Sequence, residues 1–181
     1  MDDSSLVPLL GPLPTFFLFT GYPAVGKSEL AKLVSQRFDY TFFSADLVAK
    51  ELFGDSNPYV LTDGQIAATY ADLTQRSHTA LAAKRNVVVD AAAYNQDKRR
   101  SLLYTPTHAQ CYLVWITADE AIVQERLMHR ERKDDSTEKW KARVGWEDPA
   151  ENPYYKLLGP YVNNDRNDLD RIVAVLEGRR E

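Results

Sequence analysis

The hydrophobic pattern of the chain alternates between two periods. Continuous apolar runs, typical of buried strands, occur at 15–20, 40–43, 87–90 and 110–116, and a last short strand is expected at 161–163. Apolar residues at spacings of three and four predict amphipathic helices at 30–38, 46–53, 63–84, 95–104 and 169–176. Strands that alternate with helices indicate an α/β protein, in which one parallel sheet is covered on both faces.

Three stretches interrupt this pattern. Residues 117–120, Thr-Ala-Asp-Glu, have the spacing of a capping box, which predicts that another helix begins there. Residues 126–141 are dense in charge and poor in apolar side chains, which indicates a mobile, solvated segment. Prolines interrupt residues 1–14, so we expect a flexible leader there and a single domain over 15–181.

The composition excludes several classes of protein. Hydrophobic residues make up 44% of the 181 residues, which excludes a wholly disordered chain. The net charge of -4 argues against a protein that depends mainly on non-specific nucleic-acid contacts. The single cysteine, Cys111, excludes an intramolecular disulfide and a multi-cysteine zinc site. The apolar run at 6–19 has no basic region before it, and no apolar run reaches membrane-spanning length, so a cytoplasmic protein without a membrane segment is expected.

One segment matches a phosphate-binding motif. Residues 21–28, Gly-Tyr-Pro-Ala-Val-Gly-Lys-Ser, fit the pattern G-x-x-x-x-G-K-[ST] between a predicted strand and a predicted helix. Glycines let the backbone close around a phosphate, and the helix N-terminus attracts the anion. We expect Lys27 at the β- and γ-phosphates and the Ser28 hydroxyl on Mg²⁺. The nucleotide-binding residues expected here are Gly21, Ala24, Val25, Gly26, Lys27, Ser28 and Glu29.

Two carboxylates follow strands at the same expected edge of the sheet. Asp90 closes the strand at 87–90, where it is a candidate Mg²⁺ ligand, with the capping of the next turn as the alternative. Asp46 follows the strand at 40–43 and is a candidate to orient or deprotonate an acceptor hydroxyl. The alternative for Asp46, or for Ser44 beside it, is a helix N-cap.

Basic and aromatic clusters have two explanations each. Arg126 and Arg130 share a helix face and are candidates to stabilise charge on a γ-phosphate, although they could equally complement the helix dipole. The sequence Lys-Arg-Arg at 98–100 predicts a solvated helix face, with a contact to an anionic acceptor as the alternative. The aromatic residues after the charged segment are expected to pack rather than to stack on bases; they are Trp140, Trp146, Tyr154 and Tyr155.

These segments together resemble the small P-loop kinases of the AAA_33 type, which are related to polynucleotide kinase modules, chloramphenicol phosphotransferase and gluconate and shikimate kinases. The resemblance covers roughly residues 15–178. It rests on GYPAVGKSELAKLV, FFSADLVAKELFG, VVVDAAAYNQDKRR and CYLVWITADEAIVQERLMHRERK.

The resemblance implies a three-layer P-loop NTPase fold with a five-stranded parallel sheet of order 2-3-1-4-5. It implies ATP and Mg²⁺ as cofactors and transfer of the γ-phosphoryl group to a hydroxyl. It places the acceptor-side carboxylate at Asp46, the lid arginines at Arg126 and Arg130, a lid at about 127–147 and, weakly, an adenine-side residue at Asn164. The segment at 133–137 departs from the serine-aspartate pair common in relatives with a lid.

Four readings of the activity stay open. A small-molecule acceptor is favoured, and a 5′-hydroxyl polynucleotide is the alternative that the net charge disfavours. A nucleotide-dependent switch with slow ATPase activity is a further alternative, although the guanine motif N-K-x-D is absent. A nucleoside monophosphate kinase is less favoured, because Asp46 would repel an acceptor phosphate.

Overall fold

The computed structural model describes residues 13–57, 59–105, 108–129 and 137–178. Most of the expected leader, and Arg130, lie outside the described residues. Five parallel strands form one sheet in the order β2-β3-β1-β4-β5, which confirms the predicted α/β architecture. The strands are β1 (Thr15–Thr20), β2 (Thr41–Ser44), β3 (Val87–Asp90), β4 (Gln110–Thr117) and β5 (Lys156–Val162).

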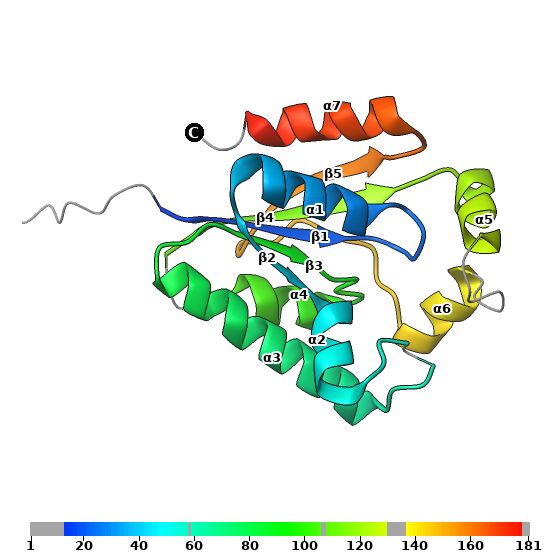
Figure 1. Cartoon of the computed structure of the whole chain (residues 1–181), viewed down its shortest axis with the longest axis horizontal. Helices are drawn as coiled ribbons and strands as arrows, with labels where there is room; N and C mark the ends of the chain where they lie inside the picture. Colours follow the sequence, from blue (N-terminus) through cyan, green and yellow to red (C-terminus); the bar gives the residue numbers. More distant parts are fainter. Residues whose placement is uncertain (1–12, 58, 106–107, 130–136, 179–181) are drawn as a thin grey trace, which may run out of the picture.

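Helices cover both faces of the sheet. Figure 1 shows α1 and α7 on one side of the sheet and α3 and α4 on the other. The helices are α1 (Lys27–Phe38), α2 (Ala45–Phe53), α3 (Asp63–Ala82), α4 (Gln96–Leu103), α5 (Glu120–Met128), α6 (Thr137–Val144) and α7 (Arg166–Glu177). None of the described helices is both long enough and apolar enough to span a membrane.

The alternation of side chains along β1 divides the core into two layers. Phe17 and Phe19 pack with residues of α1, α5 and α7, whereas Phe16 and Leu18 pack with residues of α2, α3 and α4. All four side chains are fully buried. A strand that is buried on both faces needs a continuous apolar run, which explains why β1 was predictable from its sequence.

The carboxyl ends of the three neighbouring strands β1, β2 and β3 lie at one edge of the sheet. Asp90 is in register with Phe19 of β1 and with Ser44 of β2. The turn at residues 21–26 and the start of α2 follow directly from these two partner strands. Ligands of open α/β sheets bind at this kind of edge, where the strand order reverses.

Several boundaries differ from the sequence predictions. β5 begins at Lys156, well before the predicted residue 161, and it pairs with β4 at the edge of the sheet. Its exposed side chains and its Gly159-Pro160 pair interrupt the apolar pattern by which a strand is recognised. The predicted capping box is wrong, because Thr117 is the last residue of β4 and Asp119 is the N-cap of α5. The Asp119 side chain makes no cap hydrogen bond and instead accepts one from Asn164 Nδ2, at 2.7 Å. The last part of the segment predicted to be mobile forms α6.

Candidate active site

The segment between β1 and α1 forms a turn that requires glycine at two positions. Gly21 has a φ of 151° and Gly26 a φ of 84°. A Cβ atom at Gly21 would collide with the backbone carbonyl of Ile116, and one at Gly26 would collide with the Asn163 side-chain amide. Ala24 also has a positive φ, of 67°. Left-handed residues within such a turn direct successive N–H groups toward one point, so the predicted phosphate-binding loop has the local backbone that an anion requires.

A pocket of about 160 Å³ opens beside this loop. Lys27 and Ser28, the first two residues of α1, line it together with Asp46 and Asp90. The pocket therefore brings together the predicted phosphate-binding cation, the predicted hydroxyl ligand and both predicted carboxylates. Glu29 lies on the exposed side of α1, where its carboxylate is 3.9 Å from Arg166, and it does not line the pocket, so contact of Glu29 with a nucleotide stays a prediction.

Asp90 is the buried charge of this pocket. It is 5% exposed, and its Oδ1 atom has no hydrogen-bond partner among the described residues. Burial raises the pKa of the Asp90 carboxyl, while the Lys27 charge and a hydrogen bond from Ser28 act in the opposite direction. A buried carboxylate oxygen without a partner is costly unless a cation occupies the site. Asp90 and Ser28 therefore fit Mg²⁺, which prefers hard oxygen ligands.

Asp46 lines the same pocket from the first turn of α2. Asp46 is exposed, whereas Asp90 is buried. The negative charge of Asp46 contributes to the raised pKa of Asp90. Ser44 holds the N-cap position of α2 without a side-chain cap hydrogen bond, so the N-cap alternative does not account for Asp46. The Asp46 carboxylate is thus available to a molecule in the pocket.

Arg126 contacts the back of the phosphate-binding loop. Its Nη1 atom donates to the carbonyl oxygens of Ala24 at 3.3 Å and Asn163 at 3.0 Å, and its Nη2 donates to that of Asn164 at 2.9 Å. These three bonds join α5 to the loop and to the segment after β5, which favours a role in holding the loop. Direct contact of Arg126 with a γ-phosphate stays a prediction, and Arg130 lies outside the described residues.

The sequence reasoning missed Asn163. This residue is 3% exposed, and its Nδ2 atom donates to the carbonyl of Val25 at 2.9 Å. The predicted adenine-side residue, Asn164, instead pairs with Asp119: its Oδ1 accepts from the Asp119 backbone N–H at 2.8 Å. A signal for Asn163 did exist, because a polar residue that directly follows a strand lies at the ligand-binding edge of the sheet. Contact of Asn164 with a nucleotide stays a prediction.

Comparison with protein families shows which family the chain belongs to. The model of the family AAA_33, described as an AAA domain, matches residues 16–146. The chain belongs to the AAA_33 family. The matched range contains the phosphate-binding loop, Asp46, Asp90 and Arg126 of this AAA_33 protein. A sequence comparison with curated proteins finds no match.

Solved structures share the fold of this AAA_33 protein at low sequence identity. A gluconokinase from Sinorhizobium meliloti 1021 has a TM-score of 0.61 and 19% identity, and the match covers 94% of this chain and all of that one. A sugar kinase from Janibacter sp. HTCC2649 has a TM-score of 0.65 and 15% identity over 91% and 95% of the two chains. A shikimate kinase from Bacteroides thetaiotaomicron has a TM-score of 0.57 and 15% identity over 91% and 97%. The fold is therefore that of small P-loop kinases.

The basic cluster at 98–100 is a solvated face only in part, because Arg100 is exposed and Lys98 is half-buried, whereas Arg99 is buried. Arg99 is 1% exposed, and its guanidinium donates to the backbone carbonyls of Ala93, at 2.8 Å, and Glu147. It also lies over the Trp146 ring, 5.3 Å from the centroid. Arg99 thus joins the loop after β3 to the segment after α6 in this AAA_33 protein. An arginine that is buried among carbonyl groups contributes to structure, so it is not available to an acceptor.

Four elements of the AAA_33 domain, together with the segment between α2 and α3, build the rest of the pocket. The four elements are α2, α3, α6 and the loop after β3, and their lining side chains include Ala49, Ile66, Tyr70, Tyr94, Trp140 and Val144. Trp140 is 5% exposed and contacts Trp146, with ring centroids 5.6 Å apart. The aromatic residues after the charged segment therefore pack, as predicted, and one of them forms a pocket wall.

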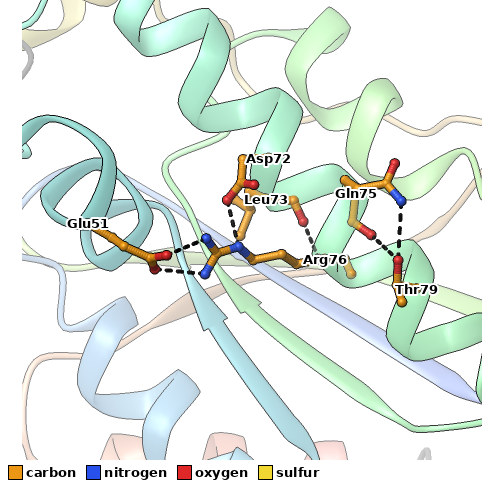
Figure 2. A network of polar contacts seen from close by, with 7 residues as sticks. Glu51, Asp72, Leu73, Gln75, Arg76 and Thr79 are labelled. Atoms are coloured by element: carbon orange, nitrogen blue, oxygen red, sulfur yellow. Dashed lines mark hydrogen bonds and ion pairs between the residues drawn. The ribbon is translucent and has the colours of Figure 1, made fainter.

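An ion-pair network holds two of these elements together. Arg76 of α3 donates to both carboxylate oxygens of Glu51 in α2, each at 2.8 Å. Its Nε atom also lies 2.6 Å from the Asp72 carboxylate, one turn earlier in α3. Figure 2 shows Arg76 between these two acidic side chains. The α2 and α3 walls of the pocket are thus fixed to each other at the surface, away from Asp46.

Proposed function

We propose that the protein is an ATP- and Mg²⁺-dependent phosphotransferase that moves the γ-phosphoryl group of ATP to a hydroxyl of a small-molecule acceptor. One observation carries this proposal: the buried, partly unpartnered Asp90 faces the same pocket as Lys27, Ser28 and Asp46. A nucleotide site needs only the first three of these groups. An additional exposed carboxylate on the other side of the pocket is what a hydroxyl acceptor requires.

Each group then has a separate task. The loop amides and Lys27 bind the phosphates and stabilise the negative charge that develops during transfer. Ser28 and Asp90 would hold Mg²⁺, which supplies charge neutralisation at the phosphates when it is bound. Asp46 orients the acceptor hydroxyl and accepts its proton as the oxygen forms a bond to the γ-phosphorus. The bond between that phosphorus and the β–γ bridging oxygen breaks, and ADP leaves with the electron pair.

The kinase names of solved neighbours with the same fold support this reaction type. Arg126 contributes by keeping the loop in place, and a second contribution at the γ-phosphate is part of the proposal, as is one from Arg130. The acceptor wall of α2, α3 and α6 separates the proposal from a simple ATPase, since hydrolysis needs no pocket for a second substrate.

The test is phosphate transfer from γ-labelled ATP with Mg²⁺ into a pool of cellular metabolites. Wild-type protein is compared with Asp46→Asn, which keeps the shape of the side chain and removes its charge. We expect a labelled small product with the wild type, none with the variant, and equal ATP affinity for both. Label released only as free phosphate by both proteins would contradict the proposal. Label found only on an added 5′-hydroxyl oligonucleotide would support the polynucleotide alternative instead.

A further inference from the structure

The charge pattern of the pocket restricts which acceptor can enter. Among its lining residues within the described part of the chain, Lys27 is the one cation, and it belongs to the phosphate-binding loop. The charged residue on the acceptor side is the acidic Asp46, whereas Asp90 belongs with Lys27 and Ser28 on the nucleotide side. An anionic acceptor would therefore meet the Asp46 carboxylate without a cation of its own among the described residues.

Two cations contact residues of the acceptor walls but do not line the pocket themselves. Arg143 of α6 forms an ion pair with Asp63 of α3 at 3.0 Å, and its Nη2 atom also donates to the Leu61 carbonyl at 3.4 Å. The Lys98 ammonium lies over the ring of Tyr70, 5.0 Å from the centroid, and is not a lining residue. These positions leave the acceptor side of the pocket with apolar and hydroxyl groups as its main contacts.

Tyr70 supplies one oriented hydrogen-bond donor in this wall. The residue is 6% exposed, and its hydroxyl oxygen accepts a hydrogen bond from the Ala93 backbone N–H at 2.9 Å. No described residue accepts the hydroxyl proton. Burial raises the pKa of Tyr70, so the hydroxyl stays protonated and neutral. The ring of Tyr94 packs edge-on against it, with centroids 5.9 Å apart, and helps to fix its direction.

Most of the other side chains that line the wall are apolar. Ala45 and Ala49 of α2, Ile66 of α3, and Trp140 and Val144 of α6 line it. The hydroxyl of Thr69, another lining residue, donates to the Gln65 carbonyl of its own helix at 2.9 Å. The wall therefore offers much apolar contact and few polar anchors, as sites for small organic ligands commonly do.

From these observations we infer that the acceptor is an alcohol without negative charge that has an apolar ring or alkyl body. Its body packs against Ile66 and Trp140, one of its oxygens accepts a hydrogen bond from Tyr70, and its reacting hydroxyl faces Asp46. The inference rests on the proposed function and narrows it to a substrate class. It separates this protein from a kinase whose acceptor is a sugar acid or a phosphorylated compound, because such an acceptor needs a cationic pocket.

The first test separates the metabolite pool by charge. The pool is passed over an anion-exchange resin at pH 7, and the unbound and bound fractions are assayed separately with wild-type protein and γ-labelled ATP. We expect the unbound fraction to support at least about 90% of the transfer. Transfer supported mainly by the bound, anionic fraction would overturn the inference and leave the proposed phosphotransferase intact. Transfer supported by neither fraction would contradict the proposed function, and the inference would fall with it.

The second test removes the Tyr70 hydroxyl. The unbound fraction that supports transfer is titrated in place of a pure acceptor. Tyr70→Phe should raise the amount of this fraction needed for half-maximal transfer by about fivefold to tenfold, because one neutral hydrogen bond to the acceptor is lost. The half-saturating ATP concentration should not change. Tyr155→Phe is the matched control, because Tyr155 is also a buried tyrosine, its hydroxyl donates to a backbone carbonyl, and it does not line the pocket. Equal effects of the two substitutions would overturn the role of Tyr70 as an acceptor contact.

Discussion

The nucleotide side and the acceptor side of the pocket are built in different ways. The nucleotide side consists mainly of backbone, held in one turn at residues 21–28 that Arg126 and Asn163 support from behind. The acceptor side consists of side chains from four elements that are far apart in sequence. The first is a local feature and can be recognised as a motif. The second exists only once the helices are packed, so it can vary without changing the reaction.

The largest expected effects on transfer are at Lys27 on the nucleotide side and at Asp46 on the acceptor side. Lys27→Ala removes the charge that binds the β- and γ-phosphates, so transfer should fall by at least about 10²–10³-fold. The affinity for ATP should fall with it, whereas Asp46→Asn should abolish transfer and spare ATP binding. Calorimetric titration with ATP, run on both variants, checks this contrast. If Asp46→Asn weakens ATP binding as much as Lys27→Ala does, Asp46 contributes to nucleotide binding, and the two sides of the pocket do not have separate functions.

Asp90 should show opposite effects on stability and on activity. Its pKa is raised in the folded protein, so the folded state binds its proton more tightly than the unfolded chain does. The ionised form therefore costs stability above the folded pKa, and this cost disappears as the pH falls through that pKa toward the unfolded value. Asp90→Asn should stabilise the Mg²⁺-free protein at neutral pH, with a rise in the melting temperature of about 2–4 °C for each kcal/mol.

The measurement is thermal unfolding of wild type and Asp90→Asn with and without Mg²⁺, at pH 8 and at pH 4. We expect the difference between the two proteins to shrink at the lower pH. Mg²⁺-dependent transfer should be lost in the variant, and added Mg²⁺ should stabilise only the wild type. If Asp90→Asn is less stable than the wild type at pH 8 without Mg²⁺, the ionised Asp90 carboxylate does not destabilise the Mg²⁺-free protein.

The sequence predicted the features whose causes are local. The strand at 15–20 is buried on both faces and therefore reads as one apolar run, and the motif at 21–28 carries its own backbone geometry. The burial of Arg99 has a distant cause, since its partners are the carbonyls of Ala93 and Glu147 and the ring of Trp146. Its flanking charges, Lys98 and Arg100, made a solvated face the natural prediction.

Asn163 was missed for a related reason. Its importance depends on where β5 ends, and β5 is an edge strand in which exposed residues and a Gly-Pro pair interrupt the apolar pattern. A residue cannot be placed at the ligand-binding edge until the strand before it has been recognised. The individual residues of the acceptor wall could not be named from the sequence, because they come from α2, α3 and α6 with no shared motif.

Asn163 and Asn164 offer a matched pair that tests the support behind the loop. Asn163→Ala leaves the buried carbonyl of Val25 without its donor, which should cost about 1–3 kcal/mol and weaken ATP binding. Asn164→Ala breaks bonds to Asp119 only on the exposed side, so it should have a smaller effect. Urea unfolding and ATP titration on both variants measure the difference. A larger loss of ATP affinity from Asn164→Ala would restore the prediction that Asn164 faces the nucleotide.

The smallest expected effect concerns the ion pairs that join α2 to α3. Arg76→Gln should leave the stability of the protein nearly unchanged, because exposed ion pairs contribute little. It should nevertheless raise the half-saturating acceptor concentration, by less than about fivefold, because Glu51 no longer fixes α2 against α3. ATP affinity should not change, since neither helix contributes to the loop at residues 21–28.

Arg37→Gln is the control for this prediction. Arg37 forms an ion pair of the same kind with Glu177, at 3.2 Å, but it joins α1 to α7 on the other face of the sheet. Concentrated salt should weaken acceptor binding by the wild type toward that of Arg76→Gln, because salt screens exposed ion pairs, and it should leave Arg76→Gln itself nearly unaffected. If Arg76→Gln and Arg37→Gln change the half-saturating acceptor concentration equally, the ion pair between α2 and α3 has no specific role in the acceptor wall. An effect confined to Arg76→Gln would show that the acceptor side depends on contacts between helices, in contrast to the nucleotide side, which depends on one turn of backbone.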